Sequence, residues 1–540
     1  MRPRDLDTLA STSYDVLIVG GGIHGLAIAY DAASRGLRTA LIDAGDFGGA
    51  ASSNHQKTVH GGLRSLQYGR FGYARHSIYE RRALARIAPW LLRPLPFIVG
   101  TYRSVTRGRL ALRAAFRIDQ WLGRNRNVGV EPELHLPAPR LVSKAATLRL
   151  FAGVRPENLT GGAQWYDYQM VEADRLTFAF AAAADRAGAN LANYVEATAP
   201  IRDGDRIVGM QARDVLAGTE LTIRAAAIVN AAGAHAGTIM TRFGVKRDYP
   251  LLKAMSLFTT KPASDIALAA PASEGRMLTL VPWRSRALVG TSQSKGFAEP
   301  GDTGASAAEV ERLVADANVA FPALKLTPAD VTLVHRGVVP AVKSRAGAPD
   351  LRLIPEVYDH AGEGAPGAFT VVGAKYSSAR GVAERVTNMV ARRLGKRTAP
   401  SRTATTVLPG AGIADHEALA IETARAHGID LPIAAIRHLI ARYAERGADV
   451  MAAMRHGALR QTLTPTEPTM AAEVVYVIRE EMAVRLTDII IRRTGAGAMG
   501  HPGQDAVRAC ASIAAAELGW SPERVAEEIA ALDRSYAITG

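Results

Sequence analysis

The sequence predicts an α/β protein in three parts: a parallel-sheet domain, an antiparallel-β (α+β) domain interleaved with it, and an all-α C-terminal domain. Three observations support this prediction. A strand–turn–helix–strand unit occupies residues 14–43, short apolar runs recur through residues 241–365, and amphipathic helical patterns follow residue 402. The 540 residues are enough for roughly three domains of ordinary size.

The first element is a βαβ unit of the kind that binds dinucleotides. Gly20, Gly22 and Gly25 form a G-x-G-x-x-G turn, and Asp43 follows about 20 residues later. Gly20 permits the tight turn, Gly22 lets a pyrophosphate approach the backbone, and Gly25 lets the helix pack on the strand. The helix N-terminus favours phosphate, and Asp43 can accept hydrogen bonds from ribose hydroxyls. The unit is expected to comprise a strand at 14–19, a helix at 26–35 and a strand at 37–42.

A polar, glycine-rich stretch at 46–71 and a helix at 73–87 stand where an NAD domain would continue with further strands. This order indicates an extended segment that lies along a cofactor. The motifs to weigh with it are VGGGIHG at 19–25, ASSNHQKTVHGGLRSLQYGRF at 51–71, YERRALARIAPWL at 79–91, IVNAAGAHAG at 228–237, VPW…VGTS at 281–292 and VVGAKYSSARGVAE at 371–384. In these motifs the chain resembles the FAD-dependent glycerol-3-phosphate dehydrogenases, within the D-amino-acid-oxidase-like flavoproteins. The resemblance covers about residues 14–395 and is weaker beyond them.

The resemblance implies a set of FAD-binding residues beyond the glycine turn. The expected contacts to the phosphates and flavin come from Ser52, Ser53 and Lys57, those to the isoalloxazine ring from His60, Gly61 and Gly62, and those to the adenine half from Asn230, Ala231, Ala232 and Gly233. The late motif supplies Gly373, Lys375, Ser377 and Ser378 at the flavin end. A helix N-terminus with a lysine nearby would stabilise the negative charge of a reduced flavin. His24, inside the glycine turn, is expected to be a spacer.

A basic amphipathic helix is predicted within residues 102–127. This stretch holds seven arginines (103, 107, 109, 113, 117, 124 and 126) against one acid, Asp119. Leu110, Ala114, Ile118 and Trp121 share one helical face. Such a helix can lie on an anionic membrane, or it can be an ordinary surface helix packed by its apolar stripe. The related dehydrogenases deliver electrons to membrane quinone, which favours the membrane interpretation.

Four cationic residues are candidates to hold an anionic substrate. By the resemblance they are Arg64 directly after HGGL, Lys253 before AMSLF, Arg336 in HRGVVPAV and Lys375 at the flavin end. The short apolar runs around them, such as 277–283 and 287–292, predict an antiparallel sheet over the flavin.

The substrate half departs from the family pattern in three places. Val339 stands where the family has a phosphate-binding arginine, Ser256 where it has a histidine, and Ser65 where it has a tyrosine. Histidines 60, 235 and 335 remain as possible bases by residue type.

The C-terminal part reads as helices at 413–428, 433–447, 470–493, 504–519 and 521–537, the last with a Ser–Pro cap. A regulatory or oligomeric role is open, so a homo-oligomer is possible by this interpretation. The expected domains are an FAD-binding Rossmann-like domain (12–95, 166–240 and 366–398), a substrate domain (96–165 and 241–365) and a helical domain (402–540).

Composition narrows the function classes. The hydrophobic fraction of 48% and charged fraction of 21% exclude a disordered, collagenous or coiled-coil chain. The single cysteine, Cys510, excludes a disulfide framework, and no metal site is expected. The net charge of +14 favours an anionic partner, although compositional bias also explains it, and no nucleic-acid-binding motif accompanies it. Without a spanning run or a signal peptide, the expected location is cytoplasmic, with peripheral contact to the inner face of the membrane.

The resemblance implies an FAD-dependent oxidoreductase. The expected reaction is hydride transfer from a secondary alcohol, sn-glycerol 3-phosphate or a related anion, to flavin N5, with electrons then passing to quinone or oxygen. The near alternative is a flavoenzyme of the same fold that acts on a 2-hydroxy acid or an amine. The alternative from another class is a non-catalytic FAD- or nucleic-acid-binding protein.

Overall fold

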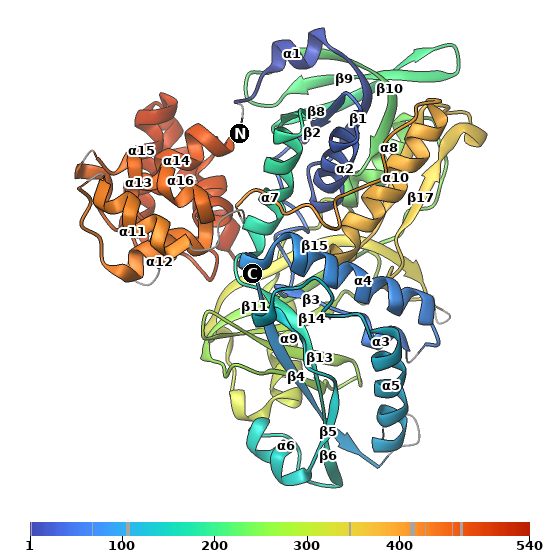
Figure 1. Ribbon diagram of the computed structural model, residues 1–540, viewed down its shortest axis with the longest axis vertical. Coiled ribbons are helices and arrows are strands. Elements are labelled where there is room, and N and C mark those ends of the chain that lie inside the picture. The colour runs from blue at the N-terminus through green and yellow to red at the C-terminus, as the bar shows by residue number, and fades with distance from the viewer. Residues whose placement is uncertain are drawn as a thin grey trace.

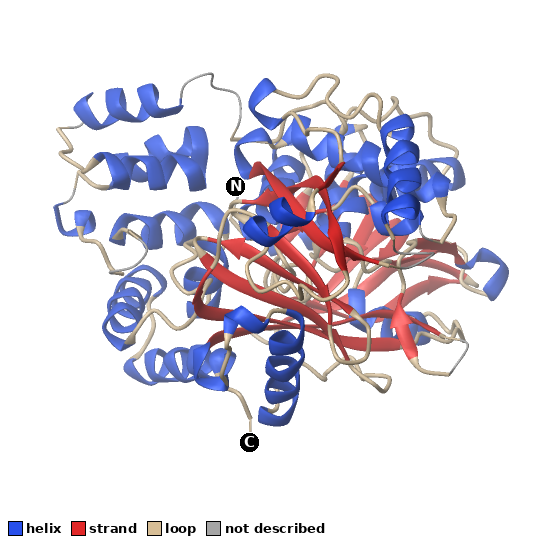
Figure 2. Ribbon diagram, turned by 90° about the horizontal axis from the view of Figure 1, so that it is seen from below, coloured by secondary structure: helices blue, strands red, loops and turns tan. Residues whose placement is uncertain are grey.

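The computed structural model contains two β-sheets and a separate group of helices, which confirms the predicted fold class (Figures 1 and 2). In Figure 1 the first sheet and its helices lie at the top, the second sheet lies below them, and the orange and red C-terminal helices lie to the left. The structure describes residues 1, 3–66, 68–103, 108–344, 347–410, 416–426, 428–455, 457–464 and 468–539.

The first sheet is parallel at its centre. β1 pairs in parallel with β2 and β10, β2 with β7, and β10 with β18, whereas β17, β9 and β8 join in antiparallel fashion. Val19 is in register with both Ile42 and Asn230, so three strands end at the same edge. Open α/β sheets bind their ligands at this carboxyl edge. The strands are β1 (Ser13–Val19), β2 (Thr39–Ile42), β7 (Asn190–Ala192), β8 (Val195–Asp203), β9 (Arg206–Asp214), β10 (Glu220–Asn230), β17 (Glu356–Asp359) and β18 (Ala368–Val372).

Alternating side chains of β1 feed two hydrophobic clusters, one on each face of the sheet. Val16 and Ile18 belong to a cluster shared with three helices, whereas Leu17 and Val19 belong to a cluster on the other face. The three helices are α2 (Ile23–Ser34), α7 (Ala173–Arg186) and α10 (Ala379–Arg393), with α2 packed against the other two. The other face is covered by α1 (Leu6–Ser11), α8 (Ala236–Arg242) and the β8–β9 hairpin.

The second sheet is antiparallel, except that β12 runs parallel to β4. β4 and β6 pair along their whole lengths, so residues 92–95 and 166–170, expected in the FAD-binding domain, continue into this sheet. The strand order is β16-β15-β11-β14-β13-β12-β4-β6-β3, with β5 on β6. The strands are β3 (Thr58–Val59), β4 (Leu92–Tyr102), β5 (Arg140–Val142), β6 (Leu159–Met170), β11 (Leu251–Pro262), β12 (Ala267–Pro271), β13 (Met277–Trp283), β14 (Arg286–Gln293), β15 (Val331–Lys343) and β16 (Pro349–Leu351).

α9 packs on one face of this second sheet, against β12 and β14, and α5 and α6 lie against β6. The basic stretch folds as α5 from Arg109, so the helix begins later than residue 102, and Arg107 lies outside the described residues. The helices are α3 (Leu63–Leu66), α4 (Phe71–Ile87), α5 (Arg109–Leu122), α6 (Lys144–Leu150) and α9 (Ala307–Ala320).

The C-terminal helices form a domain with its own hydrophobic core, in which Cys510 is buried. The expected single helix at 470–493 is wrong. It ends at Glu481, where Met482 adopts φ +55 and packs into the core shared by the first sheet and α2, α7 and α10, and a π-helical turn, Asp488–Arg493, follows. The helices are α11 (His416–Ala426), α12 (Ile433–Tyr443), α13 (Gly447–Ala453), α14 (Ala471–Glu481), α15 (Gln504–Leu518) and α16 (Pro522–Tyr536).

The end of the chain is bonded to the second sheet's domain. Ala307 N donates to the carbonyl of Thr539 at 2.8 Å, and Thr539 N donates to the carbonyl of Ala305 at 2.9 Å. Arg336 Nη2 of β15 donates to the carbonyl of Ser535 at 3.1 Å. The C-terminal domain therefore contacts both other parts of the molecule.

None of the helices among the described residues combines the length and apolar character needed to cross a membrane.

Candidate active site

The glycine turn after β1 packs closely against the backbone around it. Gly20 has φ +110, and a Cβ there would lie 2.6 Å from the carbonyl oxygen of Ala231. A Cβ on Gly25 would lie 1.8 Å from the carbonyl oxygen of Gly20, so only glycine lets α2 pack this closely on the turn. Gly22 is the N-cap of α2 and offers no side chain to the helix end. α2 begins three residues before the predicted residue 26, directly at this turn.

The segment that follows β2 faces the start of α2. Ser52 Oγ accepts a hydrogen bond from Ile23 N at 3.0 Å, at the position where a helix N-terminus would hold a phosphate. Ser53 Oγ donates to the carbonyl of Ala50. Lys57 is buried, and its Nζ donates to the carbonyl of Ser53 at 2.8 Å. In this structure Lys57 therefore holds the segment together through its ammonium group.

Asp43 ends β2 and fixes the glycine turn. Its Oδ2 accepts from Gly21 N at 2.5 Å and its Oδ1 accepts from Gly45 N at 2.7 Å. Burial raises the pKa of this carboxyl, although the two N–H groups oppose the shift. Each oxygen keeps a second lone pair, so the carboxylate can also accept a ribose hydroxyl.

The turn after β10 lies at the same edge of the sheet. Asn230 is buried, and its Oδ1 accepts from Ala232 N at 3.2 Å. The carbonyl of Gly233 accepts from the Tyr249 hydroxyl at 2.7 Å. The small residues Ala232 and Gly233 thus border the glycine turn, where the resemblance expects the adenine half of the cofactor.

A buried carboxylate, Asp167 of β6, organises the other end of the site. His60 Nδ1 lies 3.1 Å from Asp167 Oδ2, Gly61 N donates to Oδ1 at 2.8 Å, and Arg81 forms an ion pair with Oδ1. Despite burial, Arg81, His60 and Gly61 lower the pKa of Asp167 to about 2. The other ring nitrogen of His60, Nε2, lies 2.9 Å from the Thr58 hydroxyl, and 44% of the His60 side chain is exposed.

Lys375 approaches this cluster from the turn after β18. Its Nζ donates to Ser77 Oγ at 2.8 Å and lies 5.0 Å from the ring centre of Tyr73. Burial lowers the pKa of Lys375 to about 8, and the carboxylate of Asp167 opposes the shift. A Cβ on Gly62 would lie 2.8 Å from the Ser77 Cβ, so the His-Gly-Gly segment packs directly on α4. The structure thus brings His60, Gly61, Gly62 and Lys375 together.

The rest of the late motif is packed rather than exposed. A Cβ on Gly373 would lie 3.1 Å from His24 Nε2, and burial lowers the pKa of His24 to about 4, in keeping with a neutral spacer. Ser377 and Ser378 are buried, and the Ser378 hydroxyl donates to the carbonyl of Lys375 at 2.7 Å. Ser378 therefore fixes the backbone that carries Lys375.

Two predicted substrate cations have protein partners. Lys253 Nζ lies 3.0 Å from Asp302 Oδ1 and 2.6 Å from Glu309 Oε1, so its charge is compensated. Arg336 donates to the carbonyl of Ser535 in the C-terminal domain.

The three positions that depart from the family pattern hold uncharged side chains within the folded protein. Ser256 and Ser65 are buried, and Val339 pairs with Leu252 across the β11–β15 ladder. The backbone of Arg64 lies in α3, but its side chain is outside the described part of the structure.

Of the three histidines considered as bases, only His60 lies in this cluster. His335 is buried with its ring 4.8 Å from that of Phe258, and burial lowers its pKa well below the usual value. His235 lies on the short turn that follows Gly233.

The fold and site define a class: a dinucleotide-binding α/β protein whose ligand edge is the carboxyl edge of the first sheet. The glycine turn at Gly20 and Gly22, the start of α2 and the Asp43 carboxylate fit the phosphates and ribose of a dinucleotide. The chain matches the family described as "FAD dependent oxidoreductase" over residues 15–389 and the "C-terminal domain of alpha-glycerophosphate oxidase" over residues 401–525. The chain belongs to the FAD-dependent oxidoreductase family, and its cofactor is FAD.

Curated relatives extend over nearly the whole chain. It is 30% identical to the glycerol-3-phosphate dehydrogenase of Synechocystis sp., over 97% of each chain. It is 29% identical to glycerol-3-phosphate dehydrogenase 2 of Mycobacterium tuberculosis, over 97% of this chain and 88% of that protein. Among solved structures, it resembles the glycerol-3-phosphate dehydrogenase of Bacillus halodurans complexed with FAD, with a TM-score of 0.75 and 23% identity over 98% of this chain and 96% of that one.

Sequence reasoning missed Asp167, Arg81 and Ser77. Asp167 lies 107 positions from His60, and only the β3–β6 pairing brings the two together. The available signal was that Asp167 is the one charged residue in the otherwise uncharged strand β6, because an unpaired carboxylate is rarely buried in a strand.

Proposed function

We propose that the chain oxidises sn-glycerol 3-phosphate to dihydroxyacetone phosphate with FAD as the hydride acceptor. The relative named glycerol-3-phosphate dehydrogenase, 30% identical over 97% of the chain, carries the proposal. The cluster of His60, Asp167 and Lys375 supports it, because it places a candidate base and a cation side by side. Bound FAD supplies the electrophilic N5 to which the carbinol hydride transfers.

We infer that the residues of the carboxyl edge hold FAD. The N–H groups at the start of α2, with Gly20, Gly22 and Ser52, would bind the pyrophosphate, and Asp43 would bind the ribose. Lys57 and Ser53 would fix the segment beside the phosphates. Gly61 and Gly62 would present their backbone to the flavin ring, and because neither carries a Cβ their other side packs directly on Arg81 and Ser77 of α4.

His60 is the base in this proposal. Asp167 accepts from Nδ1–H, so Nε2 is the nitrogen that can accept a proton. In this structure Nε2 lies 2.9 Å from the Thr58 hydroxyl, and the substrate hydroxyl would replace that hydroxyl as the hydrogen-bond donor to Nε2. The ionised Asp167 would stabilise the imidazolium that forms, as a buried carboxylate does behind a catalytic histidine.

Lys375 and Arg64 are the proposed cationic partners of the substrate phosphate and the reduced flavin. Lys375 is held by Ser77 near the His60 cluster, and Arg64 follows the His-Gly-Gly segment within α3. Both would hold the phosphate end or the reduced flavin. Lys253, paired with Asp302 and Glu309, would act through the substrate domain's packing.

Anaerobic flavin bleaching tests the substrate. Purified holoprotein is mixed with sn-glycerol 3-phosphate, glycerol, lactate, 2-hydroxyglutarate, glycine and proline, and the flavin absorbance near 450 nm is followed as a spectroscopic readout. Rapid bleaching by glycerol 3-phosphate, and not by glycerol, is expected. Bleaching only by an unphosphorylated compound would overturn the substrate assignment while keeping the flavoenzyme.

A second candidate is a same-fold oxidoreductase acting on a 2-hydroxy acid or an amine. The compensated charge of Lys253 and the apolar Val339 favour it, because both reduce the positive charge available to a phosphate. The same substrate panel separates the two candidates.

We propose that α5 rests on an anionic membrane surface. Leu110 and Trp121 are 81% and 67% exposed, and Arg113 and Arg117 lie exposed on the same helical face. Of the predicted stripe, Leu110, Ala114 and Trp121 are exposed and Ile118 is half-buried, whereas Phe116 and Asp119 on another side of the helix face the protein. Exposed Trp and Leu beside arginines are typical of an interfacial helix.

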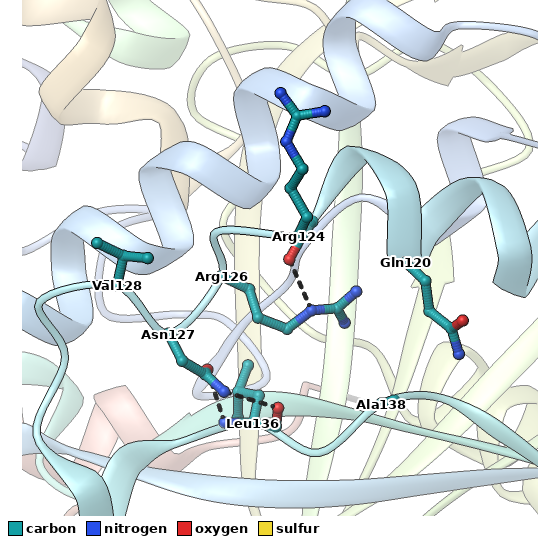
Figure 3. A pocket seen from close by; sticks show the side chains of 8 residues that line it. Gln120, Arg124, Arg126, Asn127, Val128, Leu136 and Ala138 are labelled. Carbon is teal, nitrogen blue, oxygen red and sulfur yellow. Dashed lines mark hydrogen bonds between the residues drawn. The ribbon is translucent and has the colours of Figure 1, made fainter.

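A hollow of about 470 Å³ adjoins the end of α5 and adds to this surface (Figure 3). Its lining residues include Gln120, Arg124, Arg126 and Asn127. Arg126 donates to the carbonyl of Gly123 and pairs with Asp119, whereas the Arg124 side chain points away from Arg126. Arg124 would thus add a further cation for lipid headgroups.

Vesicle binding tests this contact. The double variant R113Q/R117Q should bind anionic vesicles about thirtyfold more weakly, at about 1 kcal/mol for each basic residue at the surface. R213Q/R508Q, which removes the same charge elsewhere, is the control and should bind as the parent does. An equal loss of vesicle binding in both variants would show that net charge, and not α5, determines the binding.

Quinone is the electron acceptor that this membrane contact favours, and oxygen is the alternative. Oxidation of the reduced protein by a short-chain quinone, compared with air, distinguishes them. Reoxidation that is faster with oxygen would contradict the quinone proposal.

A further inference from the structure

The loop after Asp43 is bonded to the glycine turn on both sides of Asp46. Gly21 N donates to Asp43, and Gly48 N donates to the carbonyl of Gly21 at 2.9 Å. A Cβ on Gly21 would lie 2.7 Å from the ring of Phe47, so the loop and the turn are in direct contact. The position of residues 43–48 therefore sets the shape of the turn that faces the FAD phosphates.

Asp46 points away from this site and is held by the C-terminal domain. Arg493 binds it with both ends of its guanidinium group, Nη1 to Oδ2 at 2.9 Å and Nη2 to Oδ1 at 2.7 Å. Arg492 Nε donates to Oδ2 at 2.8 Å, and Asn193 Nδ2 donates to Oδ1 at 3.1 Å. The Asp46 side chain is fully buried. A planar fork on a carboxylate fixes both position and orientation.

The π-helical turn lets two consecutive arginines reach one carboxylate. Arg492 Nη2 also donates to Asp488 Oδ1 at 2.6 Å, and that oxygen accepts from the Tyr194 hydroxyl at 2.7 Å. Asp488 Oδ2 accepts from the backbone N–H groups of Val484 and Arg485. The two arginines thus meet two carboxylates, and the turn is fastened at its own start.

Neighbouring contacts fasten the same segment to the FAD-binding domain. Asn193 Nδ2 donates to the carbonyl of Met482 at 2.9 Å, and the Met482 side chain lies in that domain's core. Glu481 binds Arg175 of α7 at 2.5 and 2.8 Å. Residues 481–493 therefore dock as one unit, and an undocked segment would leave Asp46 buried without its counter-charges.

We propose that Arg492 and Arg493 are positioning residues for FAD: through Asp46 they hold the 43–48 loop in the shape that binds the cofactor, so FAD binding and docking of the C-terminal domain strengthen each other. The proposal rests on the proposed placement of FAD at the glycine turn, and it is independent of the substrate. Coupling between two binding events is reciprocal, so each can be measured from the other's side.

Hydrogen exchange on the full-length protein tests the coupling without any variant. FAD added to apoprotein should slow amide exchange in residues 20–49 and also in residues 484–494 of the C-terminal domain. Protection of 20–49 alone would overturn the coupling while leaving the FAD site in place. Protection of neither segment would overturn the placement of FAD itself.

Flavin release from the holoprotein gives a second readout. R493Q should release FAD at least about tenfold faster, within the range of roughly 5- to 150-fold typical of coupled sites. R493K, which keeps the charge without the fork, should lie between R493Q and the parent. The rate of flavin reduction at saturating FAD should stay within about twofold of the parent, because neither arginine lies in the His60 cluster.

R479Q is the matched control. Arg479 binds Glu517 through two guanidinium nitrogens at 2.6 and 2.8 Å, wholly within the C-terminal domain, so its loss removes a forked ion pair without touching Asp46. R479Q should release FAD as the parent does. Equal acceleration in R479Q and R493Q, or an unchanged rate in folded R493Q, would overturn the proposal. If R493Q does not fold, R492Q replaces it under the same criteria, since Arg492 binds the same carboxylate and is partly exposed.

Discussion

Asp167 is an ionised carboxylate in the protein interior, and His60, Gly61 and Arg81 all bond to it. Its negative charge orients the imidazole of the proposed base and neutralises a buried guanidinium. A protonated Asp167 would lose at least one of these hydrogen bonds, because each carboxylate oxygen already accepts from a donor. It therefore links the stability of the interior with the chemistry of the site.

Replacement of Asp167 by Asn should lower both the rate of flavin reduction and the stability of the fold. We expect the rate of flavin reduction to fall about 10²- to 10⁴-fold, since the base loses its orientation and its counter-charge. The free energy of unfolding should fall by about 3–5 kcal/mol, because Arg81 is left buried and unpaired. Stopped-flow reduction and denaturant titration measure the two effects. H60N should reproduce the rate loss with a smaller loss of stability, and a normal rate in H60N would remove His60 as the base.

Lys375 gives the site a predicted pH dependence. Its pKa is lowered to about 8, so the ammonium is charged below pH 8 and becomes neutral as the pH rises through that value. Only the charged form attracts the substrate phosphate, so the KM for glycerol 3-phosphate should rise about tenfold per pH unit above 8. A KM profile from pH 7 to 9.5 tests this, with K375M as the comparison. A flat profile in the parent, or the same slope in K375M, would assign the dependence to another group.

At this scale the sequence predicts residues by motif and misses their partners. Gly20 and Gly25 follow from spacing alone, because the turn's geometry is local. Lys253 does not, because Asp302 and Glu309 are far along the chain and only folding brings them to its ammonium group. Charge compensation is a property of three-dimensional neighbours, and no single-sequence pattern encodes it.

The β1–turn–α2 element depends on two glycines for different reasons. Gly20 adopts φ +110, whereas Gly25 is an ordinary helical residue whose missing Cβ lets α2 touch the turn. The element therefore tolerates no side chain at the contact point, even one as small as alanine.

The variant G25A should unfold more readily and lose FAD. A Cβ 1.8 Å from the Gly20 carbonyl forces the helix off the turn, at a cost of about 3 kcal/mol. G72A in α4 is the control, because a Cβ there meets nothing within 4 Å. It should leave stability unchanged or raise it by up to about 1 kcal/mol. Thermal unfolding and bound-flavin content measure both variants, and equal stability of the two would contradict the packing argument.

Element types were predictable from periodicity, whereas some boundaries and breaks were not. The apolar pattern runs unbroken through residues 470–493, yet α14 stops at Glu481. The break arises because Met482 gains burial in another domain's core by leaving the helix. A tertiary contact of this kind outweighs local propensity, and local propensity is what the sequence pattern reports.

Both sheets of the molecule are built from segments that are far apart in the sequence, and the order of the motifs predicts this arrangement only in part. The motifs do not predict that β3, directly before His60, joins the second sheet by pairing with β6. The proposed base thus directly follows a two-residue strand, which is too short to predict by alternation. The outer boundaries of the C-terminal domain are predicted more easily, since helical periodicity there is long and uniform.

The C-terminal domain and the rest of the molecule should unfold together. Arg175–Glu481 and Arg493–Asp46 are buried ion pairs across their interface, and Met482 fills the core of the other side. Calorimetry on the holoprotein should give one transition in which both parts lose their structure together. R493Q should separate the domains into two transitions. Two transitions in the parent would show that the interface is weaker than its buried charges imply.

The bonds at the end of the chain have a mechanical consequence. Residues 481–493 are fastened to the FAD-binding domain, while Ser535 and Thr539 are fastened to β15 and the start of α9 in the substrate domain. The C-terminal domain therefore connects the two sheets. A wide hinge opening between the sheets would break its bonds to one of them. Substrate and product are therefore expected to enter and leave without a wide opening between the two sheets.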